Sequence, residues 1–273
     1  MRTAEGNEHR LNNQFKQANL LDRYFLYFPR SEMVGAPGDV GLGYEDVFFS
    51  ASDGTKLHGW FIPGESEITL LWFHGNAGNI SHRVENILML HRQIGVNVFI
   101  FDYRGYGRSE GSPSEGGIYL DAEAALDYLR SRQDINQDRI VLFGRSLGCA
   151  VAVEMATHHD EYAVILESPF TSIRAVAKRS NPVLSLFLPV SLVIRSRYDS
   201  LSKIKNVRSP VMVLHGDQDE TIPHDMGRQL FDAANEPKRF YTIEGAAHND
   251  TYQAGGDAYF DALRRFIEGP AGG

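Results

Sequence analysis

Cysteine and long hydrophobic runs are almost absent from this chain of 273 residues. Its one cysteine, Cys149, has no second cysteine to pair with, which excludes a secreted domain held together by internal disulfides. No CxxC or CxxxH cluster is present, so we expect no structural zinc site. No run of about 18 apolar residues is present either, so we expect no transmembrane helix.

The chain has fewer basic than acidic residues. Its 35 Asp and Glu residues outnumber its 27 Lys and Arg residues, which gives a net charge of −8. An acidic surface repels phosphate backbones, so we expect no nucleic-acid partner. The first residues, MRTAEGNEHRLNNQFKQ, are polar and lack the apolar core of a signal peptide. These features together predict a cytoplasmic protein, with association at a membrane surface as the alternative.

An apolar stripe interrupts the otherwise polar N-terminal segment. Leu20, Tyr24 and Phe28 recur at helical spacing, and Leu21 and Phe25 lie beside them. The simplest interpretation is a short helix packed on the body of the protein. The alternative is a peripheral membrane contact, or a dimer contact, through residues 20–28.

Short apolar, β-branched or aromatic runs, typical of strands, follow from residue 44 onward. Helical stripes lie between several of them, and this alternation predicts an α/β fold with an eight-stranded, mostly parallel sheet and helices on both faces. The turn Ser52-Asp53-Gly54-Thr55 joins the first two runs and predicts an antiparallel pair at the start of the sheet. The expected strands are Glu45–Ser50, Leu57–Ile62, Thr69–Phe73, Asn97–Phe101, Arg139–Phe143, Ala163–Leu166, Val211–Leu214 and Phe240–Ile243.

Residues 171–209 break this alternation and contain the most apolar stretch of the chain, 182–194, which Pro189 interrupts. We interpret them as a small helical cap inserted after the sixth strand. The cap either lines an acyl groove or packs on the domain. The sequence therefore predicts an N-terminal tail with an amphipathic segment (1–43), an α/β domain (44–268) that carries the cap, and a C-terminal tail (269–273).

The sequence G-R-S-L-G at positions 144–148 matches the pattern G-x-S-x-G. It follows a predicted strand and precedes a run of small, helix-compatible residues, which is the context of a strand–serine–helix turn. A serine on this turn is exposed above the sheet, and glycines on either side let strand and helix pack closely. We therefore predict that Ser146 is a nucleophile.

A serine nucleophile needs a base, and ten histidines compete for that role. In hydrolases with this turn, the acid and then the histidine follow the serine in the chain. His248 follows the predicted final strand and satisfies this order, whereas His215 precedes the acid candidates and His224 is expected to begin a helix. We predict His248 as the base.

The acid is expected after the sixth or seventh strand. The segment 214–223 supplies Asp217 and Asp219, and Glu167 after the sixth strand is the rival. We favour Asp219, because Asp217 is well placed to tie its own loop as a turn residue. An acid in this position orients the imidazole without taking its proton.

The segment F-H-G-N-A-G-N at 73–79 follows the third predicted strand, where hydrolases of this type place one oxyanion donor. We assign the two donors to the backbone N–H groups of Asn76 and Leu147. His74 is expected to brace this loop instead of acting as a base. Cys149 is expected to be a small core residue of the helix that follows the serine.

Five motifs together resemble one family. They are HGNAGN, DYRGYGRSEG at 102–111, GRSLG, HGDQDETIP and GAAHND. In combination they are similar to the serine-aminopeptidase-like α/β hydrolases, and most similar to the α/β-hydrolase domain-containing esterases, lipases and depalmitoylases. The resemblance covers about residues 44–268. Many members of that family begin with a membrane-spanning helix, and residues 1–28 depart from this because they are too polar.

The resemblance implies hydrolysis of a carboxylic ester or thioester by a serine enzyme, through an acyl-enzyme intermediate, on a small-molecule or acyl substrate. It implies no metal and no organic cofactor. It carries over Ser146, Asp219 and His248 as the catalytic triad, and Asn76 and Leu147 as the oxyanion hole, while the DYRGYG loop is expected to be structural. The alternatives are an aminopeptidase-like hydrolase and a non-catalytic binding protein on the same fold.

Overall fold

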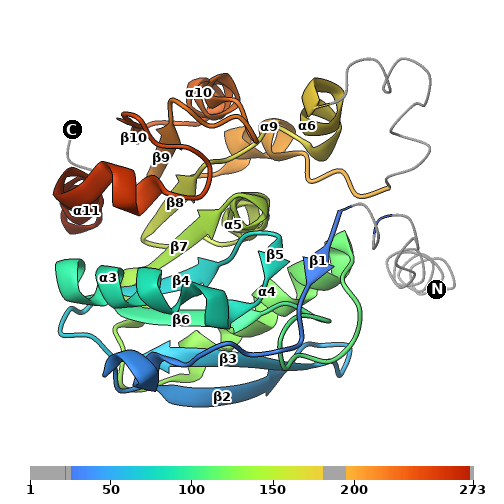
Figure 1. Ribbon diagram of the computed structural model, residues 1–273, viewed down its shortest axis with the longest axis vertical. Helices are drawn as coiled ribbons and strands as arrows, with labels where there is room; N and C mark the ends of the chain where they lie inside the picture. The colour runs from blue at the N-terminus through green and yellow to red at the C-terminus, as the bar shows by residue number, and fades with distance from the viewer. Residues whose placement is uncertain (1–21, 23–25, 181–194, 271–273) are drawn as a thin grey trace, which may run out of the picture.

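An eight-stranded sheet forms the centre of the protein (Figure 1), in a computed structural model that describes residues 22, 26–180 and 195–270. The strand order is β10-β9-β8-β7-β4-β6-β3-β2. The sheet and its surrounding helices confirm the predicted α/β fold. The strands are β2 (Glu45–Ser50), β3 (Lys56–Ile62), β4 (Thr69–Phe73), β6 (Asn97–Asp102), β7 (Ile140–Arg145), β8 (Ala163–Glu167), β9 (Val211–Gly216) and β10 (Lys238–Ile243).

The sheet begins with an antiparallel hairpin, as the turn at 52–55 predicts. Strands β2 and β3 pair antiparallel with Ser50 opposite Lys56. Strand β3 is also antiparallel to β6, and the pairings from β6 through β4, β7, β8 and β9 to β10 are parallel. Parallel strands end at the same edge of the sheet, so the loops after β4, β7, β8 and β9 converge there.

Helices cover both faces of the sheet. On one face lie α3 (Val84–Ile94) and α11 (Thr251–Glu268), and on the other lie α4 (Glu115–Ser131), α5 (Leu147–His158) and α10 (His224–Ala233). Strand β4 shows how one strand serves both layers, because Leu71 and Phe73 enter the core under α4 and α5, while Leu70 and Trp72 enter the core under α3. This period of two is the packing signature of a sheet buried on both faces.

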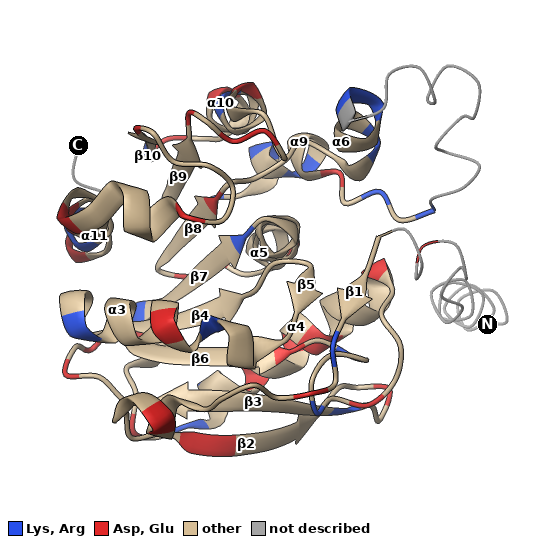
Figure 2. Cartoon of the chain, in the orientation of Figure 1, with Lys and Arg blue, Asp and Glu red and all other residues tan. Residues whose placement is uncertain are grey.

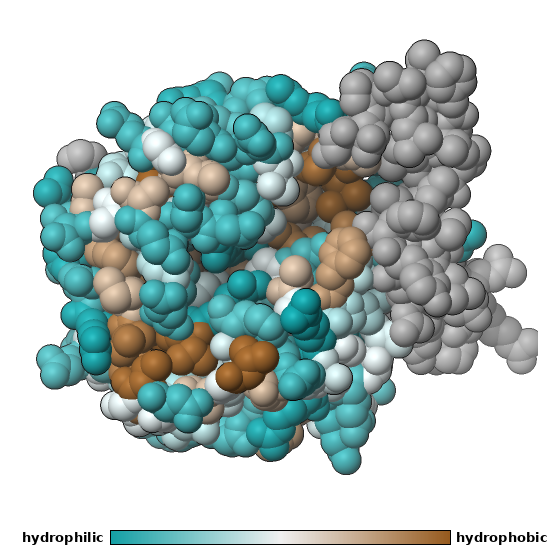
Figure 3. Space-filling view, in the orientation of Figure 1, coloured by the Kyte–Doolittle hydropathy of each residue, from teal (hydrophilic) through white to brown (hydrophobic). Residues whose placement is uncertain are grey.

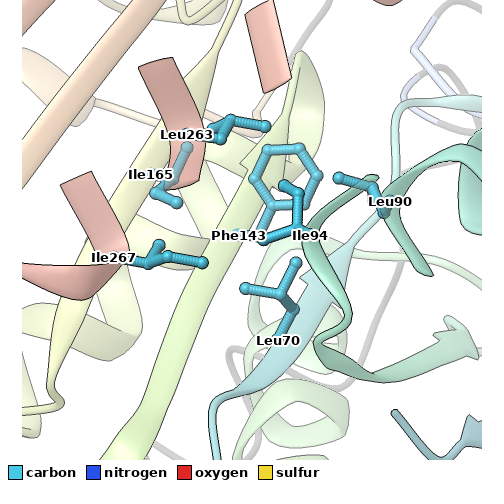
Figure 4. Close-up of a pocket in the computed structure, with 7 residues that line it drawn as sticks. All are labelled: Leu70, Leu90, Ile94, Phe143, Ile165, Leu263 and Ile267. Atoms are coloured by element: carbon cyan, nitrogen blue, oxygen red, sulfur yellow. The ribbon is translucent and has the colours of Figure 1, made fainter. Parts of the chain in front are cut away.

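The face that carries α3 and α11 contains a small apolar pocket (Figure 4). Only aliphatic and aromatic side chains reach it, and no polar group converges on it to orient a ligand. We therefore interpret it as a packing gap beneath two helices. Its lining residues are Leu70, Leu90, Ile94, Phe143, Ile165, Leu263 and Ile267.

The N-terminal segment differs from the helix expected up to Phe28. Leu26 N–H donates to Asp22 O at 2.8 Å. The chain then extends into β1 (Phe28–Pro29), which pairs in parallel with β5 (Ala77–Gly78). This backbone pairing pulls Phe28 out of the predicted helical stripe and leaves it 54% exposed.

The other members of the stripe, Leu20, Leu21, Tyr24 and Phe25, lie outside the described residues, so the peripheral membrane contact stays a prediction. No helix in the described part of the chain has the length and apolar character needed to cross a bilayer. The apolar centre of the predicted cap, 182–194, also lies outside the described residues. Its described flanks contain α6 (Ile173–Ser180) and α9 (Ser200–Lys203).

Candidate active site

The turn between β7 and α5 carries Ser146 in a left-handed conformation, with φ 53° and ψ −116°. A non-glycine residue rarely adopts a positive φ, and such strain is typical of functional turns. The surroundings enforce it, because a Cβ on Gly148 would lie 1.9 Å from Phe73 O and one on Gly144 would lie 2.5 Å from Gly148 O. Glycine at both positions lets β4, β7 and α5 meet closely enough to form the turn.

The structure brings Ser146, His248 and Asp219 into one hydrogen-bonded chain. Ser146 Oγ lies 3.1 Å from His248 Nε2, and His248 Nδ1 lies 2.7 Å from Asp219 Oδ2. These residues are contributed by the loops after β7, β10 and β9, at the shared edge of the sheet. Figure 3 shows that this face of the molecule is hollowed between the part that carries α10 and the part that carries α3.

The carboxylate of Asp219 has hydrogen-bond partners besides His248. Its Oδ1 accepts hydrogen bonds from the N–H groups of Thr221 (2.9 Å) and Ile222 (2.7 Å), and His215 Nε2 lies 3.4 Å from its Oδ2. Burial alone would raise the pKa of this carboxyl, but the hydrogen bonds from His215 and His248 and the Ile222 amide outweigh burial. The pKa of Asp219 is therefore well below its ordinary value, and the carboxylate stays ionised beside His248.

His215 is placed as a support for Asp219 and does not reach the serine. Its ring is fully buried, and its Nε2 donates to Ile222 O at 2.9 Å. The ring also fills the space above Gly227 of α10, where a Cβ would lie 2.4 Å from Nδ1. His224 begins α10, as expected from the sequence.

Asp217 has a different role from the one expected of a residue that ties its own loop. Its Oδ1 accepts a hydrogen bond from Gly245 N–H at 2.8 Å, on the loop that carries His248. Gln218 N–H also donates to Ala246 O at 3.0 Å. The loop of the acid is thereby fastened to the loop of the base.

Glu167, the rival acid, is instead the centre of a buried network. Its Oε1 accepts from Thr251 Oγ1 at 2.6 Å, and its Oε2 accepts from Tyr259 OH at 2.6 Å, both on α11. Arg145 Nε lies 3.1 Å from Oε1, and Arg145 Nη2 donates to His248 O at 3.1 Å.

The same glutamate also contacts the serine through the backbone, since Ser146 N–H donates to Glu167 O at 2.9 Å. The network therefore fixes Ser146 and His248, the predicted nucleophile and base, relative to each other. The sequence did not reveal it, because Arg145 is the variable second residue of the G-x-S-x-G pattern and its partners lie on other elements.

We expect Glu167→Gln to lower the free energy of unfolding by about 2–4 kcal/mol, because the buried guanidinium of Arg145 loses its counter-charge. An amide also offers one acceptor oxygen where the two hydroxyls of Thr251 and Tyr259 need two. The measurement is urea unfolding followed by fluorescence.

Glu123→Gln is the matched control, since Glu123 pairs with His159 at 2.7 Å and its side chain is 43% exposed. This substitution should lower the free energy of unfolding by about 1 kcal/mol or less. Equal losses in both variants would contradict a structural role for the network.

Two tyrosines of the DYRGYG segment donate hydrogen bonds to backbone carbonyls of the loop after β4. Tyr106 OH donates to Asn76 O at 2.8 Å, and Tyr103 OH donates to His74 O at 2.9 Å. The side chain of Asn76 donates to Leu26 O. Within the part of the chain that the structure describes, the backbone N–H groups of Asn76 and Leu147 donate to no other residue. Both remain available to an oxygen bound beside Ser146.

His74 is fully buried and braces this loop, as expected. Its Nδ1 donates to Gly75 O at 2.7 Å, and its ring stacks on Tyr103 with centroids 4.3 Å apart. Burial lowers the pKa of His74 to about 4, which keeps the ring neutral at physiological pH.

Cys149 of α5 is buried, and its Sγ lies 3.1 Å from both Gly144 O and Glu167 O, which share its one S–H donor. Burial raises the pKa of its thiol well above the ordinary value, so it is a packing residue and not a reactive thiolate. Among the described residues, no group of three or more His, Cys, Asp or Glu side chains is arranged to hold a metal ion.

The model of the family described as "Serine aminopeptidase, S33" matches residues 64–204. An uncharacterized Mycobacterium tuberculosis protein is 39% identical over 248 residues, which are 90% of this chain and 86% of that protein. The alpha/beta hydrolase domain-containing protein WAV2 of Arabidopsis thaliana is 39% identical over an alignment of 249 residues, which covers 85% of this chain and 81% of that protein.

Solved structures show the same fold at lower sequence identity. The Pyrococcus furiosus esterase Pf2001 superposes with a TM-score of 0.75 at 22% identity, covering 90% of this chain and 98% of the esterase. An acetyl xylan esterase from Paenibacillus sp. R4 superposes with a TM-score of 0.67 at 21% identity, covering 96% and 92%.

Proposed function

Because the chain belongs to the serine aminopeptidase (S33) family of the α/β-hydrolase superfamily, we propose that this hydrolase cleaves carboxylic esters or thioesters through an acyl-enzyme. The observation that carries the proposal is the hydrogen-bonded chain from Ser146 through His248 to Asp219. The esterases among the structural neighbours support this choice of substrate class by analogy of fold.

In the first half of the reaction, Ser146 Oγ attacks the substrate carbonyl carbon while His248 Nε2 accepts the hydroxyl proton. The ionised Asp219 accepts the Nδ1–H hydrogen bond, so the free lone pair of the imidazole faces the serine. The tetrahedral oxyanion is bound by the N–H groups of Asn76 and Leu147. The intermediate then collapses, and the alcohol or thiol leaves with the proton from His248.

In the second half, a water molecule attacks the acyl-enzyme and passes its proton to His248 Nε2. Collapse of the second tetrahedral intermediate releases the carboxylic acid, and His248 returns the proton to Ser146. The beginning of α5 at Leu147 adds the favourable N-terminal end of a helix dipole beside the oxyanion. One oxyanion donor typically contributes about 3 kcal/mol of transition-state stabilisation.

The test is to measure initial rates on p-nitrophenyl esters from acetate to palmitate, with labelling by a fluorophosphonate in parallel. We expect turnover and labelling of Ser146. A maximum at C2–C4 would indicate a small acyl pocket, and a maximum at C8 or longer would indicate an acyl groove and favour lipid or acyl-protein substrates. Absence of both turnover and labelling would overturn the proposal and favour a binding protein on this fold.

The family description favours one second candidate, a peptidase that removes an N-terminal amino acid. The same serine chemistry serves an amide, but such an enzyme must also bind the substrate's ammonium group with an acidic pocket. Release of arylamine from aminoacyl-arylamides, at rates above those on the p-nitrophenyl esters, would favour this candidate over the esterase.

A further inference from the structure

Arg83, at the end of η2 (Ile80–Arg83), has no counter-ion among the residues that the structure describes. Its Nη2 donates to Ala77 O at 2.7 Å. Among the described residues, no carboxylate lies within 4.0 Å of it, and its Nε is buried without a hydrogen-bond partner. Within the described part of the chain, one of the five side-chain N–H donors of Arg83 is therefore used.

Two other arginines of limited exposure are paired with carboxylates, while a third, Arg139, donates to Tyr162 OH at 2.5 Å. Arg104 contacts Asp53 and Asp121, and Arg132 contacts Glu45 and Asp134, all within 3 Å. A buried polar group that lacks a partner costs free energy, so each one in a folded protein calls for an explanation. Arg83 is the one arginine of the described chain with a buried side-chain nitrogen that has no hydrogen-bond partner.

The position of Arg83 connects it to the catalytic groups. Ala77 directly follows Asn76, the proposed oxyanion donor. Arg83 is also repelled electrostatically by Arg145. The Nη2 of Arg145 donates to His248 O. Figure 2 shows a basic position at the end of β7 and another near the beginning of α3, where an acidic position lies beside it.

The side chain of Arg83 is neither fully buried nor fully exposed to solvent. Its side chain is partly exposed, yet burial and then repulsion by Arg145 lower its pKa to about 10. Glu167 forms an ion pair with Arg145. The buried carboxylate of Asp102 offsets part of the charge of Arg83 from a distance, but among the described residues it forms no ion pair with Arg83 within 4.0 Å.

We propose that Arg83 binds an anionic oxygen group of the substrate, so that the preferred esters or thioesters carry a carboxylate or phosphate. This rests on the proposed esterase function and narrows its substrate class. A guanidinium matches the planar, two-oxygen geometry of these anions. The anion replaces the missing counter-ion, and its binding holds the ester against the oxyanion loop.

Two substrate pairs test the proposal and locate the anion. Mono-p-nitrophenyl adipate and its methyl ester differ in a charge on the acyl side. The compounds 4-acetoxybenzoate and methyl 4-acetoxybenzoate differ in a charge on the leaving group. We expect the wild-type protein to have a higher kcat/KM for the anionic member of at least one pair, by about five- to tenfold. No preference in either pair overturns the proposal.

Arg83→Met should remove that preference by lowering kcat/KM for the anionic ester about five- to tenfold, with less than about a twofold change for its neutral partner. Arg92→Met is the matched control, because Arg92 is an exposed arginine on α3 and its loss should leave the preference intact. An equal fall on anionic and neutral esters in Arg83→Met would mean that Arg83 only supports the loop, and would also overturn the proposal.

Two further measurements keep the outcome interpretable. Arg83→Lys retains the charge, so it should keep part of the preference even if Arg83→Met does not fold. Turnover of the neutral esters, and its loss in Ser146→Ala, tests the esterase function independently. A protein that hydrolyses neutral esters but ignores the carboxylate refutes the role of Arg83 alone, whereas one that hydrolyses no ester refutes the proposed function.

Discussion

Replacing Ser146 by alanine should lower kcat on p-nitrophenyl esters by about 10⁴- to 10⁶-fold, the range seen when a serine hydrolase loses its nucleophile. Without Oγ no acyl-enzyme can form, and any residual rate reflects binding and the two oxyanion donors alone. The substitution removes one oxygen at a site that is only partly buried, so we expect the fold to persist. Single-turnover kinetics and fluorophosphonate labelling measure the effect directly.

Ser168→Ala is the control for this experiment. Ser168 has φ 52°, nearly the same as Ser146, and its Oγ is buried without a partner among the described residues. Both variants therefore remove a serine hydroxyl at a left-handed position, but only one touches His248. Retained turnover in Ser146→Ala, with the wild-type circular dichroism spectrum, would exclude Ser146 as the nucleophile.

Replacing Asp219 by asparagine should lower kcat by about 10⁴-fold at neutral pH. The reason follows from the hydrogen bonds at Oδ1, where the N–H groups of Thr221 and Ile222 both donate. These donors require the amide oxygen of an asparagine, so its NH₂ group must face His248. The imidazole then accepts at Nδ1 and is protonated at Nε2, which leaves no lone pair to take the proton of Ser146.

Asp217→Asn separates the two aspartates of this loop. Asp217 Oδ1 accepts one backbone hydrogen bond, from Gly245, and an amide oxygen accepts it equally well. We expect kcat within about threefold of wild type, since the bond is retained. A larger loss in Asp217→Asn than in Asp219→Asn, measured as kcat on the same ester, would exchange the roles of the two residues.

The low pKa of Asp219 also sets the direction of a stability effect. Because its pKa is depressed in the folded protein, the ionised carboxylate stabilises the fold above its ordinary pKa, and this contribution is lost as the pH falls below that value. Asp219→Asn should therefore flatten the acid side of the stability–pH curve.

The sheet could be predicted from the sequence because each strand is an apolar run that must be buried. The start and end of β2 agree with the prediction, and β4 does as well. Strand ends made of charged or polar residues were missed. Strand β10 begins at Lys238 instead of Phe240, and β7 continues to Arg145, because hydrogen bonds to a neighbouring strand do not depend on the side chain.

The two-residue strands β1 and β5 carry no periodicity at all, since two residues cannot show one. Their pairing comes from the loop after β4, which bends back toward the N-terminal segment. The spacing of apolar residues predicted that Phe28 belongs to a helix. The prediction was wrong for Phe28, which lies in strand β1.

In the site, chain order was enough to place Ser146, Asp219 and His248 at one edge of the sheet, since motif and topology fix them together. The supporting shell was not predictable. Glu167 stood out only as a carboxylate after a strand, and its partners Arg145, Thr251 and Tyr259 lie 22 residues before it and 84 and 92 residues after it. Such contacts leave no local pattern in the chain.

The network around Glu167 forms late during synthesis of the protein, because two of its members lie near the C-terminus. Ribosomes make the chain from its N-terminus, so Ser146 and its strained turn emerge about a hundred residues before His248. The buried carboxylate of Glu167 gains its two hydroxyl donors only when α11, which follows His248, docks on the sheet. A nascent chain therefore carries the proposed nucleophile for some time without the proposed base, and the carboxylate of Glu167 has both hydroxyl donors only after this late helix has docked.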